Sequence, residues 1–312
     1  MHHGIAENEI KIEDILVEGI SYIEENITQS IYMCQNTTKL LIAVISHVDD
    51  INGRYLIRRT WGNHSEKDVE IRFVVGYKNK DKFSSLIAKE QLNYKDLLIT
   101  NVKETYYGLT FKTLAIVATF NDFCPSAVCV AKSDDDNIIN VKRLKHLCEL
   151  NKEIESIHGY CLKNPQVLRR GLTSTKWDIP YFVYPLKKFP YYCRGGHYII
   201  TGKDTTKRLI FGLKTMGFFK SVNLQRMPED GIFTGFAAKM AGIKRISNSN
   251  FIPCLGKNGK SCIDEVPYSS DWISAMIGNE KGTLEYFEKC SLKNKWESCM
   301  YNILFNCSAL LI

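Results

Sequence analysis

Apolar runs with the length of strands alternate with longer helical patterns between residues 40 and 133, and this alternation constrains the fold more than any other feature. Short apolar runs between helical stretches are typical of buried strands in βαβ units. The expected strands are Leu40–Ser46, Glu70–Gly76, Leu97–Thr100 and Ala127–Ser133. A short helix or turn is expected at Asp50–Trp61, and helices are expected at Lys82–Gln91 and Leu109–Phe120. The sequence therefore predicts an α/β fold with a Rossmann-like, mostly parallel central sheet.

The regular alternation of expected strands and helices ends after residue 150. Strands are expected at Ile157–Leu162, Tyr181–Tyr184 and Tyr198–Thr201, and helices near Lys203–Leu213 and Gly231–Lys239. We expect this mixed half to continue the sheet and to form the second wall of a cleft.

The 312 residues divide into three regions. Residues 1–37 are polar and acidic, and we interpret them as a loosely ordered stem or appendage. Residues 38–250 form one main domain, because no linker, repeat or low-complexity segment interrupts them. Residues 251–312 are expected to be a cysteine-containing extension packed on that domain.

The chain has eleven cysteines but no C-x-x-C pair and no histidine at zinc-ligand spacing, so a structural zinc site is not expected. Five of them follow residue 250, where helix and strand patterns weaken. A loop-rich segment tied by disulfides explains this distribution and points to a secretory-pathway lumen. The odd number leaves at least one thiol unpaired, and the connectivity stays open.

The charge pattern disfavours nucleic-acid binding. The net charge is +7, but Lys and Arg are scattered among acids without a basic block. A mild attraction to anionic substrates such as nucleotide phosphates fits this charge. No apolar stretch reaches the roughly 18 residues of a spanning helix, and the N-terminus lacks an apolar signal-peptide core. The chain is expected to be soluble as given, either cytosolic or with its anchor outside this sequence.

Three consecutive acids, Asp134, Asp135 and Asp136, end the fourth expected strand and contain a D-x-D pattern. Ligands of open α/β sheets bind at the carboxyl ends of strands, and Mg²⁺ or Mn²⁺ prefers oxygen ligands there. Acids favoured at a helix N-terminus are the alternative interpretation. No G-x-G-x-x-G follows the first strand, which disfavours a dinucleotide-binding site.

Two further segments carry cations near strand ends. Arg54, Arg58 and Arg59 follow the first expected strand, where guanidinium groups suit a diphosphate. A solvated basic helix face is the alternative. Lys112 lies in the helix after the third strand and can point to the same edge, although plain core packing explains that segment as well.

Two segments in the second half complete the pattern. Gly195 and Gly196 let the backbone approach a ligand closely, although an ordinary glycine turn has the same pattern. Glu229 and Asp230 begin an expected helix, where N-capping is the simplest explanation.

Taken together and in this order, the segments resemble the animal β-1,3-glycosyltransferase family, which includes β-1,3-galactosyltransferases and β-1,3-N-acetylglucosaminyltransferases. That family has an R-x-x-I-R-x-T-W segment, a Y-x-D-(L/I)-(L/I) strand and a Y-x-N-L-T-x-K-T helix. It also has a K-x-D-D-D strand end, a Y-P-x-Y-x-x-G-x-G-Y loop and an E-D-V-x-x-G helix start. The resemblance covers roughly residues 38–245.

The resemblance implies a GT-A fold and the inverting transfer of a sugar from a UDP donor, with Mn²⁺ or Mg²⁺ as cofactor. It implies that Asp136 and Asp134 serve the metal, and that Asp230 is the general base, with Glu229 as a less favoured substitute. The residues implied for donor binding are Ser46, Arg54, Arg58, Lys112, Asp134 and Asp135. Those implied for an acceptor or donor loop are Trp177, Gly195 and Gly196.

Galactose is the first expected donor sugar and N-acetylglucosamine the second. The implied acceptor is a glycan hydroxyl on a glycoprotein or glycolipid, the implied linkage β-1,3, and the implied location the Golgi lumen in a type II membrane protein.

Four features depart from the family pattern. Gly108 replaces Asn, Asn137 follows the acid triplet in place of an apolar residue, and Gly231 replaces Val. The last histidine is His197, so the late histidine that ligates metal in some relatives is missing. A catalytically inactive relative that binds sugar or protein is therefore the alternative function. A D-x-D-x-T phosphatase is disfavoured because no Thr follows the acids.

Overall fold

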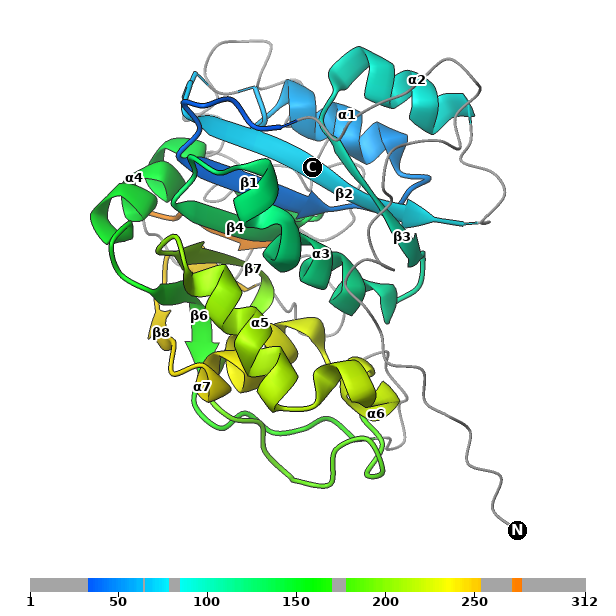
Figure 1. The fold of residues 1–312 in the computed structure, drawn as a ribbon, viewed down its shortest axis with the longest axis vertical. Helices are drawn as coiled ribbons and strands as arrows, with labels where there is room; N and C mark the ends of the chain where they lie inside the picture. Colours follow the sequence, from blue (N-terminus) through cyan, green and yellow to red (C-terminus); the bar gives the residue numbers. More distant parts are fainter. Residues whose placement is uncertain (1–32, 64, 79–84, 170–177, 254–270, 277–312) are drawn as a thin grey trace, which may run out of the picture.

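The computed structural model describes residues 33–63, 65–78, 85–169, 178–253 and 271–276, which fold around one large sheet (Figure 1). The seven strands of this sheet lie in the order β3-β2-β1-β4-β7-β6-β8. Their bounds are β1 Leu40–Ile45, β2 Val69–Tyr77, β3 Leu97–Lys103, β4 Cys129–Asp134, β6 Ser156–Leu162, β7 Tyr192–Thr201 and β8 Lys244–Ser247. Strands β1 to β4 are parallel, whereas β7 is antiparallel to β4 and β6. The predicted α/β fold, with a mostly parallel sheet and a mixed second half, is confirmed.

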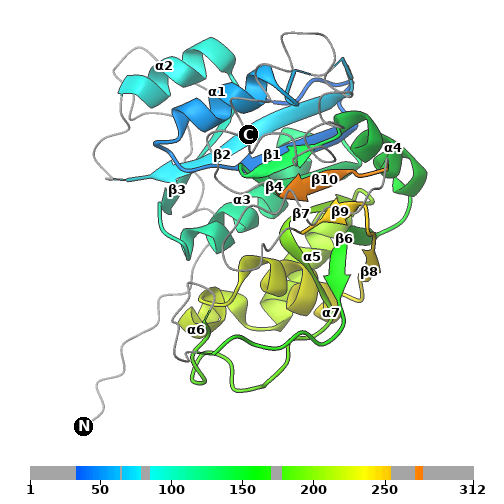
Figure 2. The same cartoon turned by 180° about the vertical axis from the view of Figure 1, so that it is seen from behind.

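Helices cover both faces of the sheet (Figures 1 and 2). One face carries α1 Ile51–Arg59, α2 Ser85–Tyr94 and α4 Val141–Asn151. The other carries α3 Gly108–Phe123, α5 Thr205–Thr215 and the π-helix η2 Gly231–Ala237. Three short helical segments complete the set, η1 Phe218–Lys220, α6 Val222–Gln225 and α7 Ala238–Met240.

Strand β1 is buried on both sides and therefore reads as a continuous apolar run. Leu40, Ile42 and Val44 pack in the core beneath α1 and α2. Leu41, Ala43 and Ile45 pack in the core beneath α3. The alternation follows from the two-residue period of a strand.

A second, three-stranded sheet begins directly after the acid triplet, and Figure 2 shows two of its strands, β9 and β10. It pairs β5 Asn137–Ile139 with β10 Ser274–Met276, which in turn pairs with β9 Phe251–Ile252. Residues 271–276 therefore contact the chain directly after Asp136. The division at residues 37 and 250 stays a prediction.

The predicted strand Tyr181–Tyr184 is wrong. The segment is a turn in which the N–H groups of Val183 and Tyr184 both donate to Pro180 O. Prolines 180 and 185 flank it, and a proline lacks the N–H group that a strand interior needs. Helix α4 and strand β5 are additions that the pattern did not predict.

Within the described residues, two disulfides lie in the main domain and a third ties residue 34 to it, so disulfides are not confined to the C-terminal extension. Their pairs are Cys34–Cys124, Cys129–Cys148 and Cys161–Cys193. The five cysteines after residue 250 lie outside the described residues. Within the described ranges, no helix has the length and apolar character needed to cross a membrane.

Candidate active site

The acid triplet lies at the carboxyl end of the sheet, as predicted. Asp134 is the last residue of β4 and is in register with Ile45, the last residue of the parallel strand β1. The N–H of Asp135 donates to Ile45 O at 3.2 Å. Because β1 and β4 end together, Ser46 and the three carboxyl groups share one sheet edge.

Burial and the charge of neighbouring acids raise the pKa of two members of the triplet, Asp135 and Asp136. Burial, and then the charge of Asp134, raises the pKa of Asp135 to about 6. Burial, followed by the charges of Asp134 and Asp135, raises the pKa of Asp136 to about 7. Crowded carboxylates of this kind are stabilised by a cation that shares their oxygens.

Lys132 connects the triplet to a segment 97 residues away in the chain. Its Nζ donates to Asp134 Oδ1 at 2.7 Å and to Glu229 Oε2 at 3.0 Å. The side chain of Lys132 is only 2% exposed. Burial alone would lower the pKa of Lys132, but the two carboxylates raise it above its ordinary value, so the ammonium stays charged.

Glu229 and Asp230 differ in what they can do. Glu229 accepts from Lys132 through one oxygen and from the Tyr198 hydroxyl through the other, at 2.8 Å. Asp230 accepts from the backbone N–H of Gly231 at 2.8 Å as η2 begins. Burial, and then the charge of Glu229, raises the pKa of Asp230 to about 7, a value suited to a general base.

The paired glycines are required by a close contact with the triplet. Gly196 has φ +70°, and a Cβ added to it would lie 2.1 Å from Asp134 Oδ2. Gly195 has φ +106°, and its added Cβ would lie 3.2 Å from His197 Nε2. Only glycine fits a left-handed backbone at such a distance from a carboxylate. In this structure the backbone of Gly196 lies against the Asp134 side chain, and the predicted close approach to a ligand stays a prediction.

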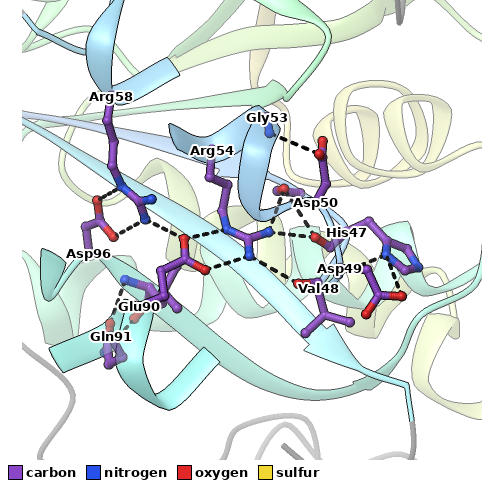
Figure 3. Close-up of polar contacts among 12 residues, drawn as sticks. His47, Val48, Asp49, Asp50, Gly53, Arg54, Arg58, Glu90, Gln91 and Asp96 are labelled. Carbon is purple, nitrogen blue, oxygen red and sulfur yellow. Dashed lines mark hydrogen bonds and ion pairs between the residues drawn. The ribbon is translucent and has the colours of Figure 1, made fainter. Parts of the chain in front are cut away.

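Arg54 is enclosed by protein groups (Figure 3). Its guanidinium donates to both Glu90 oxygens at 2.8 and 2.7 Å and to Ser46 Oγ at 3.1 Å. It also donates to the carbonyls of His47 and Val48. These bonds use all five of its N–H donors. Arg54 thus fixes the loop after β1 in this structure, and direct binding to the donor stays a prediction.

Arg58 extends the same network (Figure 3). Its Nε and Nη2 donate to Asp96 at 2.7 Å, and Nη2 also donates to Glu90 at 2.8 Å. Its guanidinium lies over the Tyr94 ring at 4.0 Å from the centroid. Burial would raise the pKa of Glu90, but Arg54 and Arg58 outweigh it and lower that pKa. Glu90 is therefore a charged support for the loop that carries Ser46.

Lys112 reaches the predicted edge. Its Nζ donates to Ser46 O at 2.9 Å and to both oxygens of Glu104 at 2.8 and 2.7 Å. Glu104 also accepts from the N–H groups of Val48 and Gly76 at 3.0 and 2.7 Å. The pair ties the ends of β1 and β2 to the β3–α3 connection.

The structure brings most predicted site residues to one edge and adds others. Ser46, Asp134 to Asp136, Gly195, Gly196, Glu229 and Asp230 lie around it, whereas Trp177 lies outside the described residues. Sequence reasoning assigned no role to Glu90, Glu104 or Tyr198, because each acts through a partner far along the chain.

The oxygen-rich edge fits a hard divalent ion. Within the described ranges no three Asp, Glu, His or Cys side chains converge on a single point. Mg²⁺-like ions are commonly held by one or two carboxylates, with the remaining positions taken by substrate phosphates and water. Asp136 fits that role, because its pKa is raised and, among the described residues, Asn137 Nδ2 at 3.3 Å is the one side-chain donor to it.

Comparison with known proteins identifies the family. The model of the Galactosyltransferase family matches residues 52–249, which is more than half of the chain. The chain therefore belongs to this family. The match runs from α1 to β8 and includes the acid triplet, Gly195, Gly196 and the 229–230 pair, whereas β1 and Ser46 precede it.

The names of individual relatives specify different donor sugars. The chain is 34% identical over 193 residues to UDP-GalNAc:beta-1,3-N-acetylgalactosaminyltransferase 1 of Homo sapiens, covering 60% of this chain and 56% of the relative. It is 25% identical over 229 residues to UDP-GlcNAc:betaGal beta-1,3-N-acetylglucosaminyltransferase 7 of Rattus norvegicus, covering 70% and 55%. With Beta-1,3-galactosyltransferase 2 of Mus musculus the identity is 27% over 213 residues, covering 65% and 47%. The chain spans about half the length of these curated relatives.

Among solved structures, the galactosyltransferase LgtC with donor and acceptor sugar analogs matches with a TM-score of 0.42 and 11% identity. The match covers 83% of this chain and 99% of that one. A likeness at this level carries no argument about the site.

Proposed function

We propose that the protein is a metal-dependent, inverting glycosyltransferase that moves a hexose from a UDP-sugar to a glycan hydroxyl and forms a β-1,3 linkage. The Lys132 bridge is the observation that carries this proposal, because it brings Asp134 and the 229–230 pair to one sheet edge. Membership of the Galactosyltransferase family supports the same reaction class.

In the proposed reaction the acceptor hydroxyl oxygen attacks the anomeric carbon from the side opposite the diphosphate. The new glycosidic bond forms as the bond from the anomeric carbon to the phosphate oxygen breaks, and UDP leaves with that electron pair. Asp230 takes the hydroxyl proton. A positioned base of this kind contributes about 10²–10⁴-fold to the rate.

Lys132 neutralises the carboxylate that lies next to the proposed base. A second free carboxylate beside Asp230 would draw the proton or repel the diphosphate. Lys132 and Tyr198 occupy both oxygens of Glu229, which leaves Asp230 as the favoured base.

A bound divalent ion would supply charge neutralisation to the departing diphosphate. In this proposal Asp136 and Asp134 would hold the ion, and Asp135 with Ser46 would face the donor's ribose and sugar. Lys112 and Arg54 hold the loop after β1 in place. A direct contact between these two side chains and the nucleotide is a further prediction.

The donor sugar is the least constrained part of the proposal. Galactose is our first candidate and N-acetylglucosamine the second. N-acetylgalactosamine enters as a third, from the name of the relative with 34% identity.

We place the protein in the Golgi lumen as part of a type II membrane protein. The three disulfides within the described residues support an oxidising compartment. The proposed acceptor is a glycan on a glycoprotein or glycolipid.

The alternative is an inactive relative that binds sugar or protein. The commitment of all Arg54 donors to protein groups favours it, since that guanidinium offers nothing to a phosphate in this structure. Transfer assays separate the two. The purified chain is incubated with Mn²⁺, a galactose- or N-acetylhexosamine-terminated acceptor and each of the three UDP-sugars. Release of UDP coupled to product, lost in Asp136→Ala, supports the enzyme, whereas no product with any donor favours the binding module.

A further inference from the structure

Arg194 is carried by a backbone segment that lies between the proposed base and the acid triplet. On one side, Thr234 Oγ1 accepts from the N–H of Cys193 and donates to its carbonyl, both at 2.9 Å, and lies 2.6 Å from Asp230 O. On the other side, Gly196 packs against the side chain that ends β4. The position of Arg194 is therefore fixed by the first turn of η2 and by the end of β4.

The guanidinium of Arg194 is half-buried and has no protein acceptor. Its central carbon lies 5.7 Å from the ring centroid of Tyr160, its register partner on β6. Its Nε is buried without a hydrogen-bond partner, and no carboxylate within the described ranges pairs with the group. Arg54 and Arg58, in contrast, both donate to carboxylates. Buried donors are normally satisfied, so a charged donor left open at a substrate-binding edge indicates an acceptor that arrives with a ligand.

The surroundings of Arg194 favour the sugar acceptor over the nucleotide as the source of that ligand group. Strands β7 and β6 lie on the side of β4 away from β1, whose end carries the proposed nucleotide residues (Figure 2). Burial, and then the charge of Asp230, raises the pKa of Tyr192, whereas Arg194 lowers it, so both charges lie near one hydroxyl. The acceptor hydroxyl must reach Asp230, which brings the acceptor sugar to this place.

The chemistry of the guanidinium specifies the ligand group. A planar guanidinium that stacks on an aromatic ring offers parallel N–H donors that match a carboxylate. The donor diphosphate is the less suitable partner, because a divalent ion at Asp136 would already neutralise it in the proposed site. The loop motif of the family leaves position 194 open, so this arginine can set an acceptor preference without changing the motif glycines.

We propose that Arg194 binds a carboxylate on the accepting sugar, so that the chain prefers acceptors ending in a hexuronic acid to neutral ones. This inference rests on the proposed transfer reaction and narrows its acceptor class. The carboxylate accepts from the stacked guanidinium, and the hydroxyl to be glycosylated faces Asp230.

Two glycosides that differ in one group test the proposal. Methyl β-galactoside has a hydroxymethyl group where methyl β-galacturonoside has a carboxylate. Transfer to each is measured with Mn²⁺ and each of the three UDP-sugars, and binding of each in the presence of UDP and Mn²⁺ is measured by saturation-transfer NMR. We expect kcat/KM for the galacturonoside to exceed that for the galactoside by about 10–100-fold, the range of a hydrogen-bonded charge pair.

Substitution of Arg194 should change the ratio of the two kcat/KM values. Arg194→Gln should lower that ratio by about 10–100-fold, because the charge and the paired donors are lost. Arg194→Lys keeps the charge but not the planar fork, so it should lower the ratio by a smaller factor. Each variant is first checked for its fold by far-ultraviolet circular dichroism.

Arg245→Gln is the matched control. The guanidinium of Arg245 also lies 5.7 Å from a tyrosine ring, that of Tyr191, and its Nε is also buried without a partner. It differs because it donates to Ile243 O at 2.8 Å and because its backbone pairs with the start of β6 rather than with its end. Arg245→Gln should leave the ratio of the two kcat/KM values unchanged.

Three results would overturn the proposal. One is a folded protein that binds the two glycosides equally, or binds neither. Another is an equal fall of the ratio in Arg194→Gln and Arg245→Gln. The third is weaker UDP binding in Arg194→Gln with an unchanged ratio, because that result would assign the guanidinium to the donor diphosphate.

Failure of the transfer reaction is a separate outcome. Absence of product from both glycosides with all three donors would contradict the proposed function. Binding of the galacturonoside over the galactoside, lost in Arg194→Gln, would then still support a carboxylate site at Arg194.

Discussion

Lys132 Nζ lies 3.0 Å from Glu229 Oε2 and 2.7 Å from Asp134 Oδ1, so one buried ammonium joins the strand that ends in acids to the segment that begins η2. This contact makes Glu229 a structural partner and leaves Asp230 as the carboxylate that we propose as the base. The two acids are adjacent in sequence, yet their surroundings give them different chemistry.

Isosteric replacement of each acid separates the two roles. Asp230→Asn should lower the turnover rate by about 10²–10⁴-fold while UDP binding survives, because only the proton acceptor is lost. Activity above a tenth of wild type would contradict its assignment as base. Glu229→Gln keeps the shape but removes a charge that pairs with Lys132. We expect it to lower the free energy of unfolding by about 1–3 kcal/mol, measured by urea denaturation.

The rate of transfer should rise with pH through about 7. Burial and Glu229 raise the pKa of Asp230 to about 7, and only the deprotonated carboxylate accepts the acceptor's proton. At one unit below that pKa about a tenth of the molecules hold the active form, so kcat at pH 6 should be about tenfold below its plateau. UDP binding is measured over the same range, because Asp135 and Asp136 also titrate there. A kcat that does not change between about pH 5.5 and about pH 8 would contradict the assignment of Asp230 as the base.

Gly196→Ala should disable the donor site through Asp134. The new methyl would lie 2.1 Å from Asp134 Oδ2, so the carboxylate has to move. Gly217→Ala is the matched control, because Gly217 has φ +76° but nothing within 4 Å of its added Cβ. Both changes should cost about 1–2 kcal/mol of unfolding free energy from the left-handed backbone. Metal-dependent UDP binding should fall only in Gly196→Ala. Equal loss in the two variants would mean that backbone strain alone is responsible.

Glu90→Gln should be far more destabilising than loss of a surface ion pair. It leaves the fully buried Arg54 guanidinium without its charge partner, at a cost of about 3–5 kcal/mol in the free energy of unfolding. Lys207→Ala removes an exposed pair with Asp204 and should change that free energy by no more than about 1 kcal/mol. Urea denaturation of both variants checks the comparison, and similar values would show that the Arg54–Glu90 pair contributes little.

The parallel half of the fold was predictable because its signals are local. The apolar run of β1 and the acids that end β4 lie in single short segments, and their order fixes a βαβ arrangement. The strand prediction for Tyr181–Tyr184 was wrong because the apolar and aromatic composition of this segment suits a strand. Its flanking prolines and the hydrogen bond from the Arg169 guanidinium to Tyr184 O favour a turn instead.

The partners of the predicted site residues could not be predicted. The sequence marks Arg54, Arg58 and Lys112 as cations near a strand end. It does not indicate that Glu90 and Glu104 enclose them, because those contacts depend on how α2 and the β3–α3 connection pack against β1. The same limit applied to the three disulfides, whose members lie 90, 19 and 32 residues apart in the chain.

Calorimetric titration of the purified protein with UDP, UDP-galactose, UDP-N-acetylglucosamine and UDP-N-acetylgalactosamine, with and without Mn²⁺, tests the central claim most directly. The account predicts binding that requires the metal, is lost in Asp136→Ala and is tighter for one of the sugars. Asp136→Ala must keep the far-ultraviolet circular dichroism of the wild type for its result to count. A folded wild-type protein that binds no nucleotide with Mn²⁺ present would contradict a donor site at this edge and would favour the non-catalytic alternative.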